Sequence, residues 1–329
     1  MSSTEMSLTE MSSTEASSKK APRILCTGII VLDEVFQVEE FPQADGKVEA
    51  KGFFVVNGGC AANAAVAIAR LGGRAALAGP MGGPAGVDAN GDKVLQAFAR
   101  EKLDTTHCRR IDGYATALSA IFVNRQGERT IVTYRDERIA TAVPLDPDAI
   151  VAGADAVLAD NRFPAFVQPI CEAARHRGIP VLLDGDRPTH EDDPLFRIAS
   201  HVIFSSECLR ATTGVADLAA GLLRIATKTE AFLAVSNGPN DIVFLEGRKV
   251  CTLPVFAIPA VDTLGAGDAF HGGFVLALAE GKDEVEAMRF GAAVAGLKCT
   301  RIGGSAGAPS RAEVEAFLAR PHAAMPQKV

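Results

Sequence analysis

A glycine-rich turn that ends in an acid, Gly265-Ala266-Gly267-Asp268, is the part of the sequence best suited to chemistry. The apolar run that follows it, Ala269 to Leu278, predicts a helix. Backbone amides at a helix start carry partial positive charge and can hold a phosphate, and an Asp at the same place can take a proton from a hydroxyl. Together these features indicate phosphoryl transfer to an alcohol. A plain turn with Asp268 as the helix N-cap would account for the same residues.

A second glycine pair, Gly58-Gly59, precedes a predicted helix from Cys60 to Leu71 that contains Asn63. Glycines let backbone amides approach a ligand, and an Asn side chain offers both a donor and an acceptor. Asp33 follows the first predicted strand and could accept hydrogen bonds from two sugar hydroxyls. Each has a structural alternative, which is a buried helical Asn for Asn63 and a solvated turn for Asp33.

Composition and motifs exclude several other functions. The net charge of -7 argues against general nucleic-acid binding, which needs a basic face. No apolar run approaches the ~20 residues of a membrane span, and there is no G-x-x-x-x-G-K-[ST] phosphate loop. Phe270 stands where a dinucleotide fingerprint would have its third glycine. The 7 cysteines form no C-x-x-C pair, which is typical of a reducing, cytoplasmic protein without disulfides.

The elements that must position these residues are predicted from patterns along the chain. Strands and helices alternate from Ala154 onward, which indicates an α/β fold with a Rossmann-like, mainly parallel sheet and helices on both faces. Ligands of such sheets bind at the carboxyl ends of the strands. Four polar or small residues come directly after predicted strands, namely Gly28, Asp160, Asp184 and Ser236.

Two β-rich pieces, about 34–56 and 117–135, do not fit this alternation and are predicted to form a small β-sheet lid over the ligand edge. Residues 1–22 contain a near-repeat of MSSTE with almost nothing to bury, so they are predicted to be a disordered tail. The remainder, 23–329, is expected to be one domain that includes the lid.

Gly58-Gly59 with Asn63, followed much later by Asp262-Thr263-Leu264-Gly265-Ala266-Gly267-Asp268-Ala269-Phe270, resembles the two signature regions of the ribokinase (PfkB-type) carbohydrate kinase family. The resemblance covers about residues 23 to 320. It implies a ribokinase-like fold and ATP-dependent phosphorylation of a sugar. Asp268 would be the base, and the amides of Gly265, Ala266 and Gly267 would form the anion hole for the γ-phosphate. The residues that would hold sugar hydroxyls are Asp33, Gly58, Gly59 and Asn63.

The resemblance also implies cofactor positions. Ser236 and Gly238 match a nucleotide-loop pattern, and Gly304 lies in a turn that would border the adenine near Gly265 and Gly267. Asp262 matches a potassium site found in many members. Glu207 stands one position from the place where the family often has a glutamate that organises magnesium through water. Magnesium is expected with the phosphates, because neutralising their charge is central to phosphoryl transfer.

The sugar is expected to be a ketose. Lys47 in Asp45-Gly46-Lys47 and Arg162 in Asp160-Asn161-Arg162 are similar to the sulfofructose kinase branch, where a lysine and an arginine at these places hold the sulfonate. That branch has an Asn where this chain has Thr133. Neutral ribose or fructose is the alternative, as is a nucleoside stacked on lid phenylalanines. A sugar- or nucleotide-sensing module is a non-enzymatic alternative, although pure binding has no need of a base at position 268.

The lid also predicts assembly. A small sheet leaves an apolar face and open edges, and such edges tend to pair. We therefore expect a homodimer through the lid, unless that face packs on its own large domain. The candidates for the face are Phe36, Phe53, Phe54, Ile121 and Val123.

Overall fold

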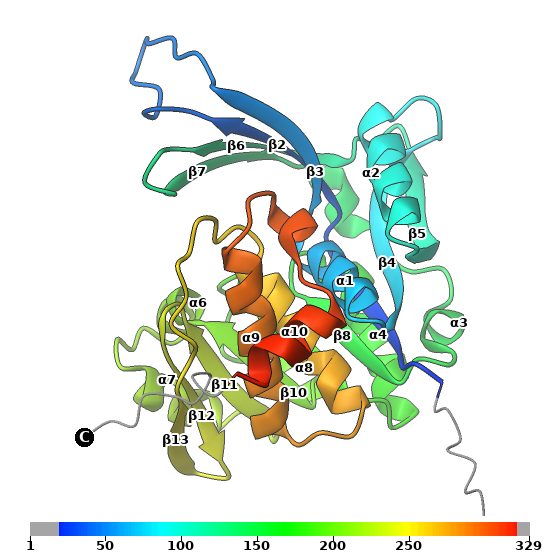
Figure 1. Cartoon of the computed structure of the whole chain (residues 1–329). Helices are drawn as coiled ribbons and strands as arrows, with labels where there is room; N and C mark the ends of the chain where they lie inside the picture. Colours follow the sequence, from blue (N-terminus) through cyan, green and yellow to red (C-terminus); the bar gives the residue numbers. More distant parts are fainter. Residues whose placement is uncertain (1–19, 321–329) are drawn as a thin grey trace, which may run out of the picture.

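The computed structural model describes residues 20–320, which are built around one large sheet (Figure 1). The sheet order is β13-β12-β11-β10-β9-β8-β1-β4-β5. In chain order its strands are β1 (Arg23–Thr27), β4 (Arg74–Gly83), β5 (Asp104–Asp112), β8 (Ala156–Asp160), β9 (Val181–Gly185), β10 (His201–Ser205), β11 (Phe232–Asn237), β12 (Asn240–Glu246) and β13 (Lys249–Leu253). Only β12 and β13 run antiparallel to their neighbours. The predicted mainly parallel sheet is confirmed. Most of the predicted tail, 1–22, lies outside the described residues.

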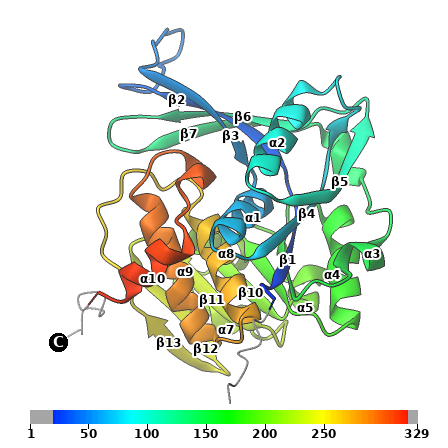
Figure 2. The ribbon, with the colours of Figure 1, turned by 45° about the vertical axis from the view of Figure 1, so that its right-hand side comes forward.

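Helices cover both faces of the sheet because its side chains alternate between two apolar cores (Figure 2). On β1, Ile24 and Cys26 join one core and Leu25 joins the other. The first core is covered by α1 (Cys60–Arg70), α2 (Ala89–Arg100), α8 (Ala266–Ala279), α9 (Glu284–Cys299) and α10 (Arg311–Leu318). The second is covered by α3 (Pro147–Val151), α4 (Pro164–His176), α5 (Pro194–Ile198), α6 (Ser206–Thr213) and α7 (Leu218–Ile225). Two short 3-10 turns, Glu137–Thr141 and Gly304–Gly307, complete the helical segments.

A second sheet forms the lid, which stands over one end of the large sheet in both views (Figures 1 and 2). Its order is β3-β2-β6-β7, with β2 (Val31–Gln37), β3 (Gly52–Gly58), β6 (Ala117–Val123) and β7 (Arg129–Tyr134). The two hairpins join through β2 and β6, which pair in parallel. Strand β2 starts earlier and β3 ends later than the piece 34–56. The turn Asn57-Gly58-Gly59 therefore follows directly from a lid strand.

The two faces of the lid differ in what they contact. On the outer face, the ring of Phe36 contacts that of Phe53 in a tilted arrangement and stacks with that of Phe122, at ring-centroid distances of 4.9 and 5.5 Å. Side chains alternate along a strand, so Phe54, Ile121 and Val123 point the other way and line cavities under the lid. The expectation that all five predicted residues share one face is therefore wrong. Phe36 and Phe53 alone belong to the outer one.

Helices α1, α8 and α9 approach one another closely because small residues line their contacts. A Cβ added at Gly272 would lie 2.8 Å from the backbone oxygen of Ala64, and one added at Gly291 would lie 2.7 Å from that of Phe270. Real side chains do not tolerate such distances, so larger residues at either position would push the helices apart. Gly272 thus fixes the spacing of α1 and α8, which begin at the two glycine-rich turns, and Gly291 fixes that of α8 and α9.

Strand β5 was missed by sequence reasoning. Its residues, DTTHCRRID, form no apolar run because it is an edge strand that pairs only with β4. Polar side chains are tolerated there since much of the strand faces solvent. Among the helices within residues 20–320, none is both long and apolar enough to cross a membrane.

Candidate active site

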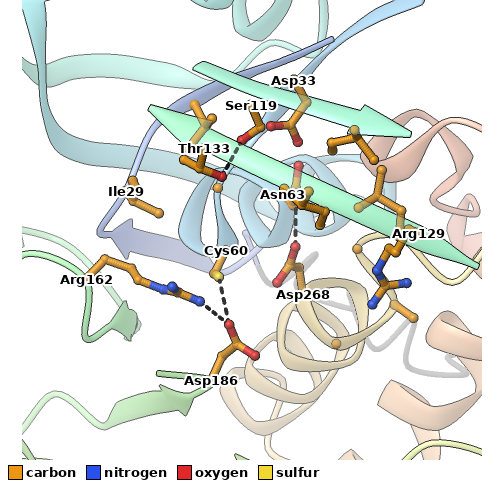
Figure 3. A pocket seen from close by; sticks show the side chains of 18 of the residues that line it. Ile29, Asp33, Cys60, Asn63, Ser119, Arg129, Thr133, Arg162, Asp186 and Asp268 are labelled. Atoms are coloured by element: carbon orange, nitrogen blue, oxygen red, sulfur yellow. Dashed lines mark hydrogen bonds and ion pairs between the residues drawn. The ribbon is translucent and has the colours of Figure 1, made fainter. Parts of the chain in front are cut away.

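Asn63 and Asp268 meet at the centre of a pocket of about 300 Å³ between the lid and the large sheet (Figure 3). Asp268 lies in the first turn of α8 and Asn63 in the first turn of α1. The Asn63 side-chain nitrogen donates a hydrogen bond of 2.8 Å to Oδ2 of Asp268. The contact brings together the two glycine-rich regions that the sequence pointed to separately.

The pKa of Asp268 is raised to about 7, chiefly by burial and then by the nearby charge of Asp184. The hydrogen bond from Asn63 opposes this shift. A general base works best when its pKa lies near the working pH, because it is then both unprotonated and basic. Asp268 is therefore suited to taking a proton from a substrate hydroxyl at neutral pH.

The turn before Asp268 leaves amides open to an anion. Gly265 adopts a left-handed conformation with φ of 75°, which allows the chain to enter α8. The amide of Ala266 donates to the Thr263 oxygen at 3.2 Å. The amides of Gly267 and Asp268 lie in the first turn of the helix, where no intrahelical partner exists. From the lid, Arg129 donates to the Thr263 hydroxyl at 2.6 Å and adds a positive charge beside this turn.

Gly58 makes room for Asp33. A Cβ at Gly58 would lie 2.0 Å from Oδ2 of Asp33, so any side chain there would displace the carboxylate. Burial raises the pKa of Asp33 to about 6, an effect that Ser119 partly offsets. Ser119 and Thr133, whose hydroxyl oxygens lie 3.1 Å apart, line the same part of the pocket from β6 and β7. The lid thus offers a cluster of oxygens to a polyol.

The amide oxygen of Asn63 is buried without a hydrogen-bond partner among the described residues. An unsatisfied buried acceptor is costly, and a substrate hydroxyl would satisfy it. Gly59, which precedes α1, has φ of 99°, and a Cβ there would lie 2.2 Å from the Ile29 oxygen. A glycine is therefore required for α1 to start this close to the end of β1.

Asp160 organises the floor of the site, a role that sequence reasoning did not assign to it. Its Oδ2 accepts hydrogen bonds from the amides of Ile29 at 2.8 Å and Ala61 at 3.3 Å. A Cβ at Gly28 would lie 2.0 Å from the same oxygen. The carboxylate therefore ties the end of β1 to the start of α1. The feature of the sequence that could have indicated this role is the position of Asp160 directly after a predicted strand.

Arg135 and Arg162 both line the pocket. Arg162 forms an ion pair with Asp186, and the guanidinium of Arg187 donates to the Arg162 carbonyl at 3.4 Å. The pKa of Arg135 is lowered by burial and by the charges of Arg162 and Arg187. In Figure 3, Arg162 lies on the opposite side of Asp268 from Arg129. Lys47, by contrast, is exposed in the β2–β3 loop and is not among the residues lining the pocket.

The residues predicted for the nucleotide lie farther along the same carboxyl edge. Ser236 is the penultimate residue of β11, and its hydroxyl donates to the Phe204 oxygen at 3.3 Å. Gly238 occupies the following turn with φ of 57°. Glu207 is exposed in the first turn of α6. None of these three lines the pocket around Asp268. They remain predictions for a nucleotide and its metal.

Asp262 holds together the turn before Gly265 and the turn at Gly303 and Gly304. Its carboxylate accepts from the amides of Leu264 at 2.8 Å, Gly303 at 2.9 Å and Gly304 at 3.3 Å. Lys298 lies against the same residue, with Nζ 2.9 Å from the Asp262 carbonyl oxygen and 3.2 Å from its Oδ2. Burial alone would raise the pKa of Asp262, but these amides and the Lys298 charge lower it. The carboxylate is thus ionised.

A further set of potential metal ligands lies beside the base. The Cys60 sulfur and carboxylate oxygens of Asp184 and Asp268 lie within 4.8 Å of one another. Magnesium prefers oxygen ligands, and a thiol between two carboxylates does not suit it. His271 is buried with Nδ1 3.3 Å from Oδ2 of Asp184. Burial opposes protonation of His271, but Asp184 outweighs it and raises its pKa. When protonated, the ring would balance part of the negative charge around Asp268.

Comparison with known proteins gives the same family as the motifs. The profile of the pfkB family carbohydrate kinases matches residues 21–311. The ribokinase of Haemophilus influenzae is 29% identical over 299 residues, which cover 88% of this chain and 96% of that protein. A crystal structure from Agrobacterium tumefaciens, provisionally assigned as a ribokinase, superimposes with a TM-score of 0.86 at 35% identity and covers 91% of this chain and 98% of its own.

A third relative shows the fold with ligands. The ribokinase of Arabidopsis thaliana, solved in complex with ribose and ATP, superimposes with a TM-score of 0.75 at 22% identity and covers 92% of this chain and all (100%) of its own. Fold, site and comparisons together define a phosphotransferase with a sugar hydroxyl as acceptor. The chain belongs to the pfkB family of carbohydrate kinases.

Proposed function

We propose that this enzyme transfers the γ-phosphoryl group of ATP to a hydroxyl of a ketose, and that the ketose carries an anionic group at its far end, as sulfofructose does. The observation that carries the second part is the group of guanidiniums around Arg162. Arg135 and Arg162 line the pocket there. Arg162 is paired with Asp186, and the charges of Asp160 and Asp184 also act on it. Burying an anion needs cationic partners, and Arg presents a fork of donors.

In the proposed reaction Asp268 takes the proton of the sugar hydroxyl, and the hydroxyl oxygen forms a bond to the γ-phosphorus. The bond between that phosphorus and the oxygen of ADP breaks. The amides of Gly267 and Asp268 face the charge on the transferred group. Asp33 and the Asn63 oxygen hold neighbouring hydroxyls. Asn63 also contacts the base, so sugar binding and base orientation depend on one side chain.

The cofactor proposal is ATP with Mg²⁺. Ser236, Gly238 and Gly304 are the residues proposed to border the nucleotide, and the ATP complex of the Arabidopsis ribokinase supports a nucleotide on this fold. Mg²⁺ would be held mainly by the phosphates and would neutralise their charge. Glu207 is its only proposed protein contact, through water. We propose no potassium ion at Asp262, because the Lys298 ammonium already contacts this residue.

A neutral sugar such as ribose or fructose is the second candidate, and the ribokinase relatives favour it. A nucleoside is less well supported. The predicted platform residues Phe36 and Phe53 contact each other on the outer face of the lid, and Phe54 lines a neighbouring cavity. The side chains that line the pocket around Asp268 are aliphatic or polar, with no aromatic ring among them. A base would find no ring to stack on.

We also propose that the enzyme is a cytoplasmic homodimer that buries the outer face of the lid. All seven cysteines are free, which fits a reducing compartment. Phe53, Val132 and Tyr134 are 54%, 62% and 59% exposed. Large apolar side chains so exposed on one face are typical of an interaction surface.

The test measures the rate of ADP release with each of a set of ketoses and pentoses as substrate, with and without a terminal phosphate or sulfonate. We expect the highest kcat/KM for an anionic ketose. Arg162→Ala should raise KM for that substrate about 30-fold or more, since losing one partner of a buried charge costs about 2–5 kcal/mol. KM for fructose should change little. Arg177→Ala, which removes an arginine paired with Asp148 on the surface, is the matched control. Turnover of neutral sugars alone would return the assignment to ribokinase or fructokinase.

A further inference from the structure

Lys298 is a lysine without solvent exposure in the middle of the kinase fold. Its side chain is 0% exposed, and it extends from α9 toward the turn that carries the anion-binding amides. Removing an ammonium from water is costly unless it is paired and hydrogen-bonded. The oxygens that it contacts both belong to Asp262. The protein therefore accepts a costly group in order to place a positive charge at this position.

The surroundings of the ammonium resemble a cation site in their chemistry. Nζ lies 2.9 Å from a backbone carbonyl oxygen and 3.2 Å from a carboxylate oxygen. Hard monovalent ions also bind to such oxygens. The buried side chain thus ends on two oxygens of Asp262.

A potassium ion does not fit beside this lysine. One carboxylate charge is already balanced by one ammonium, and the positive charge of Arg129 also acts on Lys298. A second cation at Asp262 would meet like charges in a buried place without a further anion, which is unfavourable. The potassium site that the resemblance implied at Asp262 is therefore taken by a residue of the chain itself.

We propose that Lys298 is a built-in monovalent cation that replaces potassium, so that this kinase works without an added monovalent ion. Lys298 is a positioning residue. It neutralises Asp262, and the Asp262 carboxylate holds the amides of Leu264, Gly303 and Gly304. Leu264 immediately precedes Gly265, so the ammonium fixes the turn that presents amides to the phosphate. The inference rests on the family's kinase activity and not on which sugar is used.

The experiment compares buffers of equal ionic strength that contain potassium, ammonium or tetramethylammonium, the last being too large for the site. For the wild type we expect the same kcat and the same melting temperature in all three. Lys298→Ala should lose about tenfold to a hundredfold in kcat in tetramethylammonium, because small displacements near reacting groups have effects of this size. Potassium or ammonium should restore part of the loss and raise the melting temperature of this variant.

Lys298→Met is the matched variant, because it keeps the bulk of the side chain without its charge and leaves no space for an ion. It should lose activity without recovery in potassium. A wild-type enzyme that is activated by potassium, or that shows bound rubidium at Asp262 by anomalous diffraction, would overturn the proposal. Full activity of Lys298→Ala in tetramethylammonium would do so too, as would failure of potassium to improve either kcat or the melting temperature. If Lys298→Ala does not fold, the wild-type measurements decide.

Discussion

The side-chain nitrogen of Asn63 and Oδ2 of Asp268 are 2.8 Å apart, and this bond links the first turns of α1 and α8. The other end of the Asn63 amide is a buried oxygen without a partner among the residues described. A sugar hydroxyl bound to that oxygen would be one side chain away from the base. In the proposed mechanism, one residue would then take part both in recognising the sugar and in orienting the base.

Asp268→Asn should reduce kcat by about 10²–10⁴-fold, the usual contribution of a positioned base. The amide keeps the shape of the side chain but cannot accept the proton. ATP affinity measured by calorimetry should stay close to the wild-type value. Asp283→Asn, which changes the N-cap of α9 in the same way, serves as control. Near wild-type turnover in Asp268→Asn would show that another group takes the proton.

The pH dependence of kcat/KM should follow the ionisation of Asp268. The base acts only when it is unprotonated and its pKa is about 7, so activity should rise with pH and level off above neutrality. The charge of Asp184 contributes to the raised pKa. Asp184→Asn should therefore move the acidic limb to lower pH. A rate profile that stays flat through neutral pH in the wild type would contradict this assignment.

Gly58→Ala should weaken sugar binding without affecting ATP. The added Cβ would lie 2.0 Å from Oδ2 of Asp33, so the carboxylate must leave its position. We expect KM for the sugar to rise about 10–100-fold, the equivalent of losing a hydrogen bond to a charged group. Gly296→Ala is the control, because its Cβ would make only ordinary contacts, at 3.7 Å from Ile258. An unchanged KM for the sugar would remove Asp33 from the binding site.

Val132→Glu should convert the proposed dimer into a monomer. Val132 is 62% exposed on the outer face of the lid, where a buried carboxylate would oppose association. Sedimentation velocity at micromolar concentration should show the change in mass. Val250→Glu, at a 38% exposed position on β13, should leave the mass unaltered. A wild-type protein that sediments as a monomer would eliminate the lid dimer.

Much of the scaffold could be predicted because buried strands and helices have periodic apolar patterns. The rule that ligands bind at the carboxyl ends of parallel strands correctly drew attention to Asp160 and Asp184. What could not be predicted depends on contacts between distant segments. Lys298 stands in a helix, where a lysine is normally solvated, and only the packed fold places it on Asp262. The space that Gly58 leaves for Asp33 likewise arises only when β2 pairs with β3.

The close contacts at Gly272 and Gly291 have a consequence for how this enzyme evolves. Gly272 sets the approach of α8 to α1, and Gly291 that of α9 to α8. The distance between Asn63 and Asp268 therefore depends on residues that do not line the pocket. A single methyl group at Gly272 would act as a wedge 2.8 Å from the Ala64 oxygen. An enzyme with that substitution would keep every residue of its pocket and still convert its substrate slowly. Selection for sugar turnover would therefore also act on this contact between helices, which would otherwise matter only for stability.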